Sequence, residues 1–300
     1  MIAYKCTDNS IAVNQPAVLK SFEQGKAMSE HSRRLDYEIV QVDTGYMRAG
    51  LAACYLVVDD GEVAVIDTGV ALSVDRIGAA LTELELSFQD VTHVVPTHVH
   101  LDHAGGAGKL MQVCSEASMV IHPFGSRHMI DPAKLIAGAE AVYGREGLLR
   151  NVGEIVPVAA ERVIDAADMF RFHVGKRELL VLDTPGHARH HFCIWDEKSS
   201  GIFSGDTLGV AYPELACDGR EFIFPPTTPV QFDPVAWHES IDRLMALRPE
   251  RAYLTHFGML EEPVTYMNDL HRRIDDLAEL VLGCSEAPDT LAGRVSEYFH

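Results

Sequence analysis

The chain has 300 residues, 47% of them hydrophobic, and a formal net charge of −19 at pH 7. It is long enough to bury a core as one large or two small domains, while its charge argues against binding to nucleic acid or to an anionic membrane. The sequence shows neither a signal peptide nor an apolar run of membrane-spanning length. We therefore expect a cytoplasmic protein with no nucleic-acid partner and no membrane partner.

The cysteines do not form a metal-binding pattern. Six are present and none belongs to a CxxC motif. In a chain of this length we expect reduced, mostly buried thiols rather than a thiolate zinc site. The positions are Cys6, Cys54, Cys114, Cys193, Cys217 and Cys284.

The first third of the chain changes texture near Tyr37. Residues 1–36 are weakly patterned, and the segment HSRRLD at their end is expected at the surface. The runs YEIVQVD, CYLVVDD and EVAVIDTG then predict short strands separated by turns. Helical spacing predicts a helix over 73–86, and THVVPTH and MVIH predict further strands.

The middle of the chain is helical and is followed by a second group of strands. Residues 131–149 have a helical pattern, with Asp131 suited to the N-cap and Pro132 to the first turn. The runs FRFHV, ELLVLD, FCIWD and GIFSGD predict strands. A helix around 235–247, a final strand and loop in RAYLTHFG, and a helical pattern from 262 onward complete the chain.

Two similar halves of strands and helices predict sheets that pack together, with helices outside. We divide the chain into an N-terminal extension, residues 1–36, and a main domain, residues 37–260. The main domain carries a helical insertion at about 123–150. The C-terminal helices, 261–300, are expected to pack on the same domain.

The segment THVHLDHAGG, residues 97–106, concentrates metal-ligand side chains. His98 and His100 stand two residues apart, so at the end of an extended strand they point the same way and can bind one ion. Asp102 and His103 follow in a tighter turn and can face a second ion. The two glycines at the end permit close backbone approach.

Three more ligand types each follow an apolar strand: His187 in LDTPGHARHH, Asp206 in FSGDTLG and His256 in YLTHFG. A catalytic zinc site needs about three protein ligands and a water, and a carboxylate has two oxygens with which to serve two cations. We predict one site of His98, His100 and His187, a second of Asp102, His103 and His256, and Asp206 as the bridge.

The remaining histidines are treated differently. We expect His191 to support the site or to face the substrate, whereas pocket and surface are equally weighted for His190. The others lack the strand-end context and are predicted to be packed or on the surface, away from the site: His93, His122, His128, His173, His238, His271 and His300.

Together these motifs resemble the metallo-β-lactamase fold superfamily. An H-x-H-x-D-H motif, a TPGH motif, a GDT tripeptide and a last histidine occur in the family's order, after a strand ending in VIDTG at Val65–Gly69. The resemblance covers roughly 37–258 and implies an α/β (α+β) fold, a four-layer αββα sandwich with both metals at one edge between the sheets. It also implies that Asp67 orients the site without binding metal.

Within the superfamily, TPGHARHH and GDTLG are similar to a poorly characterised hydrolase branch and to glyoxalase II and the lactonases. The flavodiiron branch has Glu in place of the second motif histidine, which here is His100. Members that process RNA would prefer a basic surface.

The leading hypothesis is a metallo-hydrolase that holds two divalent ions, with zinc favoured over iron or manganese. A metal-bridging water or hydroxide would attack an ester, thioester or lactone of a small-molecule substrate. Asp102 would steer the proton of that water, and Tyr212 is the candidate donor to the oxyanion, with an ordinary loop tyrosine as the alternative. The loop 212–232 and the helices at 131–149 would close the pocket.

Two other functions use the same residues. Imidazole and carboxylate ligands also suit iron, so a di-iron or mono-iron protein that handles oxygen or redox chemistry is the first alternative. The second is a non-catalytic, ligand-binding regulator, for which lost ligands would be the sign. A homodimer through the mid-chain or C-terminal helices is also considered.

Overall fold

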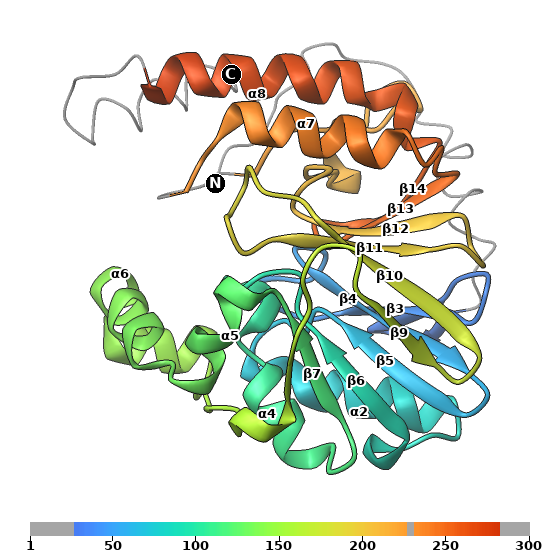
Figure 1. The fold of residues 1–300 in the computed structure, drawn as a ribbon, viewed down its shortest axis with the longest axis vertical. Helices are drawn as coiled ribbons and strands as arrows, with labels where there is room; N and C mark the ends of the chain where they lie inside the picture. The colour runs from blue at the N-terminus through green and yellow to red at the C-terminus, as the bar shows by residue number, and fades with distance from the viewer. Residues whose placement is uncertain (1–26, 227–230, 283–300) are drawn as a thin grey trace, which may run out of the picture.

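Two mixed β-sheets pack face to face in the computed structural model, which describes residues 27–226 and 231–282 (Figure 1). The first sheet contains, in spatial order, β1 (Ala27–Ser29), β2 (Ser32–Arg34), β3 (Ile39–Asp43), β4 (Ala53–Asp59), β5 (Glu62–Ile66), β6 (Val91–Val95), β7 (Ser118–Ile121) and β8 (Val163–Asp165). The second contains β14 (Gly258–Glu261), β13 (Arg251–Leu254), β12 (Gly201–Gly205), β11 (Phe192–Asp196), β10 (Arg177–Asp183) and β9 (Arg171–Val174).

The core between the sheets is built from alternate residues of each strand. On β4, Tyr55 and Val57 face the second sheet, whereas Cys54 and Leu56 pack on the opposite side. Tyr55 meets Phe203 of β12 with ring centroids 5.6 Å apart. Both faces of the sheets are covered, which is why these strands read as nearly continuous apolar runs.

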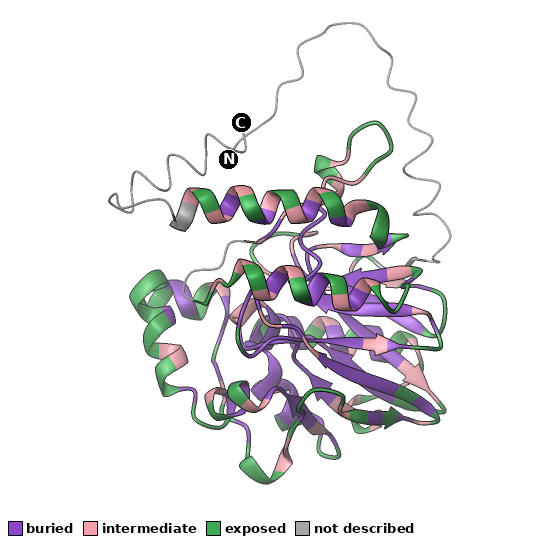
Figure 2. Cartoon of the chain, turned by 45° about the horizontal axis from the view of Figure 1, so that its top comes forward, coloured by how far each residue is buried: buried purple, intermediate pink, exposed green. Residues whose placement is uncertain are grey.

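Helices cover both outer faces, so the predicted αββα sandwich is confirmed. On the first sheet lie α2 (Val74–Glu83) and α4 (Ala107–Val113), and on the second lie α7 (Pro234–Met245) and α8 (Met267–Leu282). Buried and exposed residues alternate along α7 and α8 (Figure 2), as an amphipathic pattern requires. Asp233 begins α7 by accepting a hydrogen bond from Ala236 N at 3.1 Å.

The mid-chain insertion, predicted to be helical over about 123–150, consists of two helices. These are α5 (Pro123–Ile130) and α6 (Ala133–Asn151), and α6 stands away from both sheets in Figure 1. The backbone at Gly144 is not helical (φ 67°). The predicted N-cap is displaced by one residue: Pro132 is the cap, and Asp131 accepts a hydrogen bond from Ala133 N at 3.2 Å.

Several short elements had no sequence prediction. The strands β1 and β2 extend the first sheet into the range assigned to the N-terminal extension, and Ser32 in HSRRLD is buried rather than exposed. β8 and β14 were not predicted. The segment RAYLTHFG was expected to end in a loop, and β14 begins at its last residue, Gly258. Strands of three or four residues form because a neighbour supplies hydrogen bonds, and so few residues show no periodicity.

Three cysteines with described side chains are buried and Cys217 is exposed, all of them free. Cys6, Cys284 and His300 lie outside the described residues. So do residues 1–26 of the predicted extension and residues 283–300 of the predicted C-terminal helices. Within the described residues no helix is both long and apolar enough to cross a membrane.

Candidate metal centre

The predicted ligands converge at one edge of the sandwich, where several strands end. His98 and His100 lie in the loop between β6 and α3 (Leu101–Ala104), and Asp102 and His103 lie within α3. Three further ligands follow strands of the second sheet: His187 after β10, Asp206 after β12 and His256 after β13. The two sheets are joined here by backbone hydrogen bonds from Ala53 N to Thr255 O (2.8 Å) and from Phe192 N to Thr97 O (3.0 Å).

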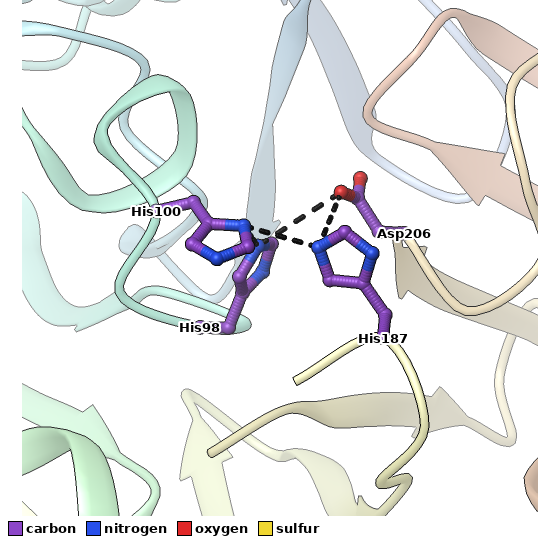
Figure 3. Close-up of side chains that lie close together, drawn as sticks. All are labelled: His98, His100, His187 and Asp206. Carbon is purple, nitrogen blue, oxygen red and sulfur yellow. Dashed lines mark hydrogen bonds and ion pairs between the residues drawn. The ribbon is translucent and has the colours of Figure 1, made fainter. Parts of the chain in front are cut away.

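The first cluster brings three ring nitrogens and one carboxylate oxygen together (Figure 3). His98 Nε2 lies 2.8 Å from His100 Nδ1, which lies 3.0 Å from His187 Nε2. Asp206 Oδ2 lies 3.1 Å from His187 Nε2. His98 is fully buried, so this nitrogen has no access to bulk water.

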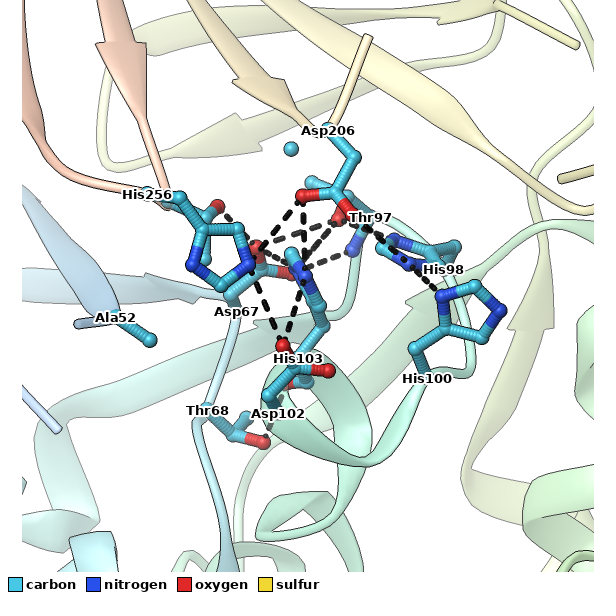
Figure 4. Close-up of polar contacts among 12 residues, drawn as sticks. Ala52, Asp67, Thr68, Thr97, His98, His100, Asp102, His103, Asp206 and His256 are labelled. Atoms are coloured by element: carbon cyan, nitrogen blue, oxygen red, sulfur yellow. Dashed lines mark hydrogen bonds and ion pairs between the residues drawn. The ribbon is translucent and has the colours of Figure 1, made fainter. Parts of the chain in front are cut away.

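The second cluster contains Asp102, His103 and His256 (Figure 4). The other oxygen of Asp206, Oδ1, lies 3.2 Å from His103 Nε2 and 3.5 Å from His256 Nε2. Asp102 Oδ2 lies 3.3 Å from His256 Nε2. Asp206 therefore turns one oxygen toward each cluster, as expected for a bridging carboxylate.

The opposite ring nitrogens fix which atoms are free to bind metal. His103 Nδ1 lies 2.8 Å from Asp67 Oδ2, and His256 Nδ1 lies 2.8 Å from the carbonyl oxygen of Leu51. Because these oxygens only accept hydrogen bonds, each Nδ1 carries a hydrogen, and Nε2 is the atom left to bind a metal once it has lost its own hydrogen. The hydrogen-bond network thus assigns the tautomer that presents Nε2 to a metal.

The donor set fits a cation. Within the described residues, His103 Nε2 and Asp206 Oδ1 are buried and make no hydrogen bond, although they lie 3.2 Å apart. Burial opposes a charge on His103, but the carboxylates of Asp206, Asp67 and Asp102 hold its pKa well above its usual value. Burial likewise opposes ionisation of Asp206, but His103, His187 and His256 hold its pKa well below the usual value. Such a mixture of ligands suits a divalent metal.

Asp67 supports this centre from the end of β5. Its Oδ1 accepts hydrogen bonds from Thr97 N at 2.8 Å and Thr97 Oγ1 at 2.9 Å, and its Oδ2 accepts one from Thr255 Oγ1 at 2.7 Å. With the contact to His103, Asp67 ties loops of both sheets together. It contacts no other member of the two clusters through the hydrogen bonds and ion pairs of the described chain.

Two glycines place neighbouring ligands. Gly205, directly before Asp206, has φ +48°, and a Cβ there would come within 2.5 Å of His191 Nε2. Gly186, directly before His187, has φ +134°, and a Cβ there would come within 2.4 Å of Trp237 Cα. Larger residues would push either loop away from the centre.

The two histidines after His187 have different environments. His191 is buried, and its Nε2 accepts a hydrogen bond from Asp206 N at 3.1 Å, so it supports the bridging residue. His190 lines the cavity above the centre, and its buried Nδ1 lacks a hydrogen-bond partner among the described residues. His128 also lines this cavity, which corrects the prediction that it lies away from the site. Its helical context gave no signal in the sequence.

The cavity has a volume of about 920 Å³ and opens above both clusters. The predicted closing segments contribute to its wall: Tyr212 and Phe224 come from the loop, and Lys134 and Tyr143 come from α6. Residues 227–230 of the predicted closing loop lie outside the described residues. The wall also contains Leu51, Val99, Leu101, Leu135, Ala139 and Val210. A cavity of this size accommodates a ligand well beyond a few atoms.

Two histidines placed away from the centre by the sequence analysis do lie elsewhere but meet each other: His238 of α7 and His271 of α8. His93 packs against Phe172 with ring centroids 5.0 Å apart, and His122 Nε2 lies 3.2 Å from Asp183 Oδ1. His173 is exposed on β9.

Several curated proteins are similar in sequence to this chain. The metallo-beta-lactamase fold-containing protein ST1585 of Sulfurisphaera tokodaii is 25% identical over 71% of this chain and 76% of its own. A hydroxyacylglutathione hydrolase of Rhodospirillum rubrum is 28% identical over 49% and 43%, respectively. The acyl-coenzyme A thioesterase MBLAC2 of Gallus gallus is 30% identical over 38% and 40%. The chain thus spans less than half the length of the last two relatives.

A solved structure supports the same fold. The archaeal ST1585 structure, from Sulfolobus tokodaii, superposes with a TM-score of 0.64 at 24% identity, covering 79% of this chain and 86% of the other. The family model of the metallo-beta-lactamase superfamily matches residues 47–256, which include every predicted ligand. On this evidence the chain belongs to the metallo-beta-lactamase superfamily.

Proposed function

We propose that the chain is a dinuclear metal-dependent hydrolase of a thioester, ester or lactone bond. The observation that carries this proposal is Asp206, whose two oxygens face separate ligand clusters 3.1 Å from His187 Nε2 and 3.2 Å from His103 Nε2. Three histidines in one cluster, and two histidines with Asp102 in the other, make two divalent ions the natural occupants. Zinc is the proposed metal.

When bound, the ions would polarise the scissile carbonyl and lower the pKa of a bound water. Asp102 would orient that water from the cavity wall. Burial favours the neutral form of Asp102, but His103 and His256 hold its pKa below the ordinary value. Because it stays ionised, Asp102 accepts a hydrogen bond from the water and steers its proton rather than storing it.

Tyr212 is the proposed donor to the negative oxygen that develops on the substrate. Its ring lies in the cavity wall, with its centroid 6.4 Å from that of His256. Burial raises the pKa of its phenol, so the side chain keeps its hydrogen at neutral pH. A neutral donor next to the reacting carbonyl stabilises the transition state without carrying charge.

Thioesters are the first substrates to test. One relative is a hydroxyacylglutathione hydrolase and another is an acyl-coenzyme A thioesterase. The wall of the cavity is largely apolar and carries the phenols of Tyr46, Tyr143 and Tyr212, which suits an acyl chain with a polar group. Esters and lactones present the same carbonyl chemistry and would be screened in parallel.

The test combines metal analysis with activity. Protein purified without added metal would be analysed for metal content, then stripped and reconstituted with zinc, iron or manganese before assay against thioesters, lactones and esters. Two zinc ions per chain with hydrolysis by the zinc form support the proposal. Two irons with a visible absorption band, and no hydrolysis by any form, would favour the iron redox alternative. Tight metal binding without turnover would favour the regulator.

A further inference from the structure

A second group of histidines and carboxylates lies on the outer helical layer. The helices α7 and α8 carry the same pattern, HESID at 238–242 and HRRID at 271–275. The isoleucines of both, Ile241 and Ile274, are fully buried against the second sheet. The shared register therefore places both histidines on the sides of the helices that face each other, where they meet.

The contacts between these helices are crossed. His238 Nε2 lies 2.9 Å from Asp275 Oδ1, and His271 Nε2 lies 3.4 Å from Asp242 Oδ1. The two Nδ1 atoms lie 2.5 Å apart. The ring planes are inclined by 25° with centroids 4.8 Å apart, so the rings are nearly coplanar and meet edge to edge. Each histidine thus has its carboxylate on the other helix.

This arrangement points two lone pairs at each other. A carboxylate only accepts hydrogen bonds, so each Nε2 carries the hydrogen and each Nδ1 is left with its lone pair. Two such lone pairs at 2.5 Å repel each other, and the contact is relieved either by a shared proton or by a metal ion around which the rings move apart.

We propose that His238 and His271 bind a transition-metal ion through their Nδ1 atoms, forming a site separate from the proposed catalytic centre. Asp275 and Asp242 would hold the ring tautomers from outside, the arrangement common around metal-bound histidines. Imidazole ligands suit Zn²⁺, Cu²⁺ and Ni²⁺. Two metal–nitrogen bonds of about 2.0–2.1 Å require the Nδ1 atoms to move from 2.5 Å to about 3–4 Å apart. The side chains of His238 and His271 are 26% and 24% exposed, so the rings have room for this movement and water can complete the coordination.

The site would fasten α8 to α7. Trp237, next to His238, packs against His187 of the first ligand cluster with ring centroids 5.6 Å apart and donates a hydrogen bond to Thr207 O. The outer ion would therefore stabilise a helix that itself supports the loops of the centre. Neither His238 nor His271 contributes to the described cavity wall, so neither is placed to contact the substrate.

The test counts metal bound by the full chain after any purification tag has been removed. Wild type, His238→Gln and His271→Gln are saturated with zinc, separated from free metal and analysed. The matched control is His173→Gln, because His173 is exposed on β9 without a second histidine among its contacts in the described chain. We expect wild type and His173→Gln to bind one more ion per chain than either His238→Gln or His271→Gln.

A second variant tests the carboxylates. Asp275→Asn should keep the fold and lower the affinity for the additional ion by about 10–100-fold, the usual effect of removing a carboxylate that hydrogen-bonds to a metal-bound histidine. The additional ion should also raise the unfolding temperature of wild type but not of His271→Gln. Copper bound at this site should show nitrogen couplings in its electron paramagnetic resonance spectrum.

Two results would overturn the proposal. One is equal metal content in wild type, His238→Gln and His271→Gln. The other combines two observations: wild type binds no additional ion, and the unfolding temperature of wild type depends on pH in a way that His271→Gln abolishes. In that case a shared proton takes the place of the metal.

Discussion

Asp206 lies between the two clusters, so its loss should affect both. We expect Asp206→Ala to lower the affinity of both ions, by more than the roughly 10–100-fold typical for a residue that only supports a ligand. His98→Ala should remove chiefly the ion of the first cluster, because His98 Nε2 lies beside His100 and His187. Metal analysis after dialysis measures both effects. Full retention in either variant contradicts the ligand assignment, and His173→Gln serves as the control.

Asp102 differs from the other carboxylate because it also faces the cavity. We expect Asp102→Asn to keep the fold and to lower kcat by about 10²-fold or more. The neutral amide is a weaker hydrogen-bond acceptor than the carboxylate, so it would attract the proton of the water less strongly. Circular dichroism and steady-state kinetics on the metal-loaded variant separate the two effects. A fully active Asp102→Asn enzyme removes this residue from the mechanism.

His190 offers the cavity an unpartnered nitrogen. The residue is only 7% exposed, and its Nδ1 has no hydrogen-bond partner in the described chain. We expect His190→Phe to retain its metals but to lose about tenfold in kcat/KM toward substrates with a polar group near the carbonyl, since one hydrogen bond is worth about 1 kcal/mol or more. Equal kcat/KM values for wild type and variant would place His190 outside substrate binding.

The convergence of the proposed ligands could be predicted because each follows an apolar strand, and strand ends meet at one edge of a sandwich. His128, His238 and His271 could not be predicted in this way, because they lie on helices. The contact between His238 and His271 joins residues 33 positions apart through the packing of two helices. The repeated HxxID pattern was the available signal, but its meaning depends on which helices pack together.

Among the strands, β10 and β11 are joined by a buried ion pair. Arg177 Nε lies 2.9 Å from Asp196 Oδ1, and both side chains are almost fully buried. Arg177→Met would leave the Asp196 carboxylate buried without its partner, so we expect a loss of about 3–5 kcal/mol in unfolding free energy. Chemical denaturation measures it.

A suitable control is Lys198→Met, which removes a more exposed pair with Asp59 at 2.9 Å. Its expected cost is about 0–1 kcal/mol. Equal losses in Arg177→Met and Lys198→Met would show that the buried pair has no special weight in the second sheet.

The longer elements followed the sequence predictions and the shorter ones did not. The helix predicted over 235–247 forms over Pro234–Met245, where a capping aspartate and a first-turn proline mark the start. β8, with three residues, carries no comparable local signal. It exists because the neighbouring strand β7 provides the hydrogen bonds, which the local sequence of β8 does not encode.

At the scale of the whole molecule, metal removal should destabilise the sandwich without changing its topology. Any ion that binds only the folded chain stabilises it, by about 2.7 kcal/mol when present at a hundredfold excess over its Kd. We expect chelation to lower the Tm and abolish hydrolysis, and zinc to restore both. An unchanged Tm after verified removal of metal would mean that the described clusters do not bind it in the folded state.

The two sheets supply complementary shares of the centre: the loop after β6 carries His98, His100, Asp102 and His103, whereas loops of the second sheet carry His187, Asp206 and His256. Neither share is sufficient alone, so a small sliding of one sheet against the other separates ligands that must converge. Metal affinity is therefore sensitive to the position of one sheet relative to the other. A substitution such as Phe203→Leu, buried between the sheets in β12, which leads directly to Asp206, should be detectable first as a change in metal affinity.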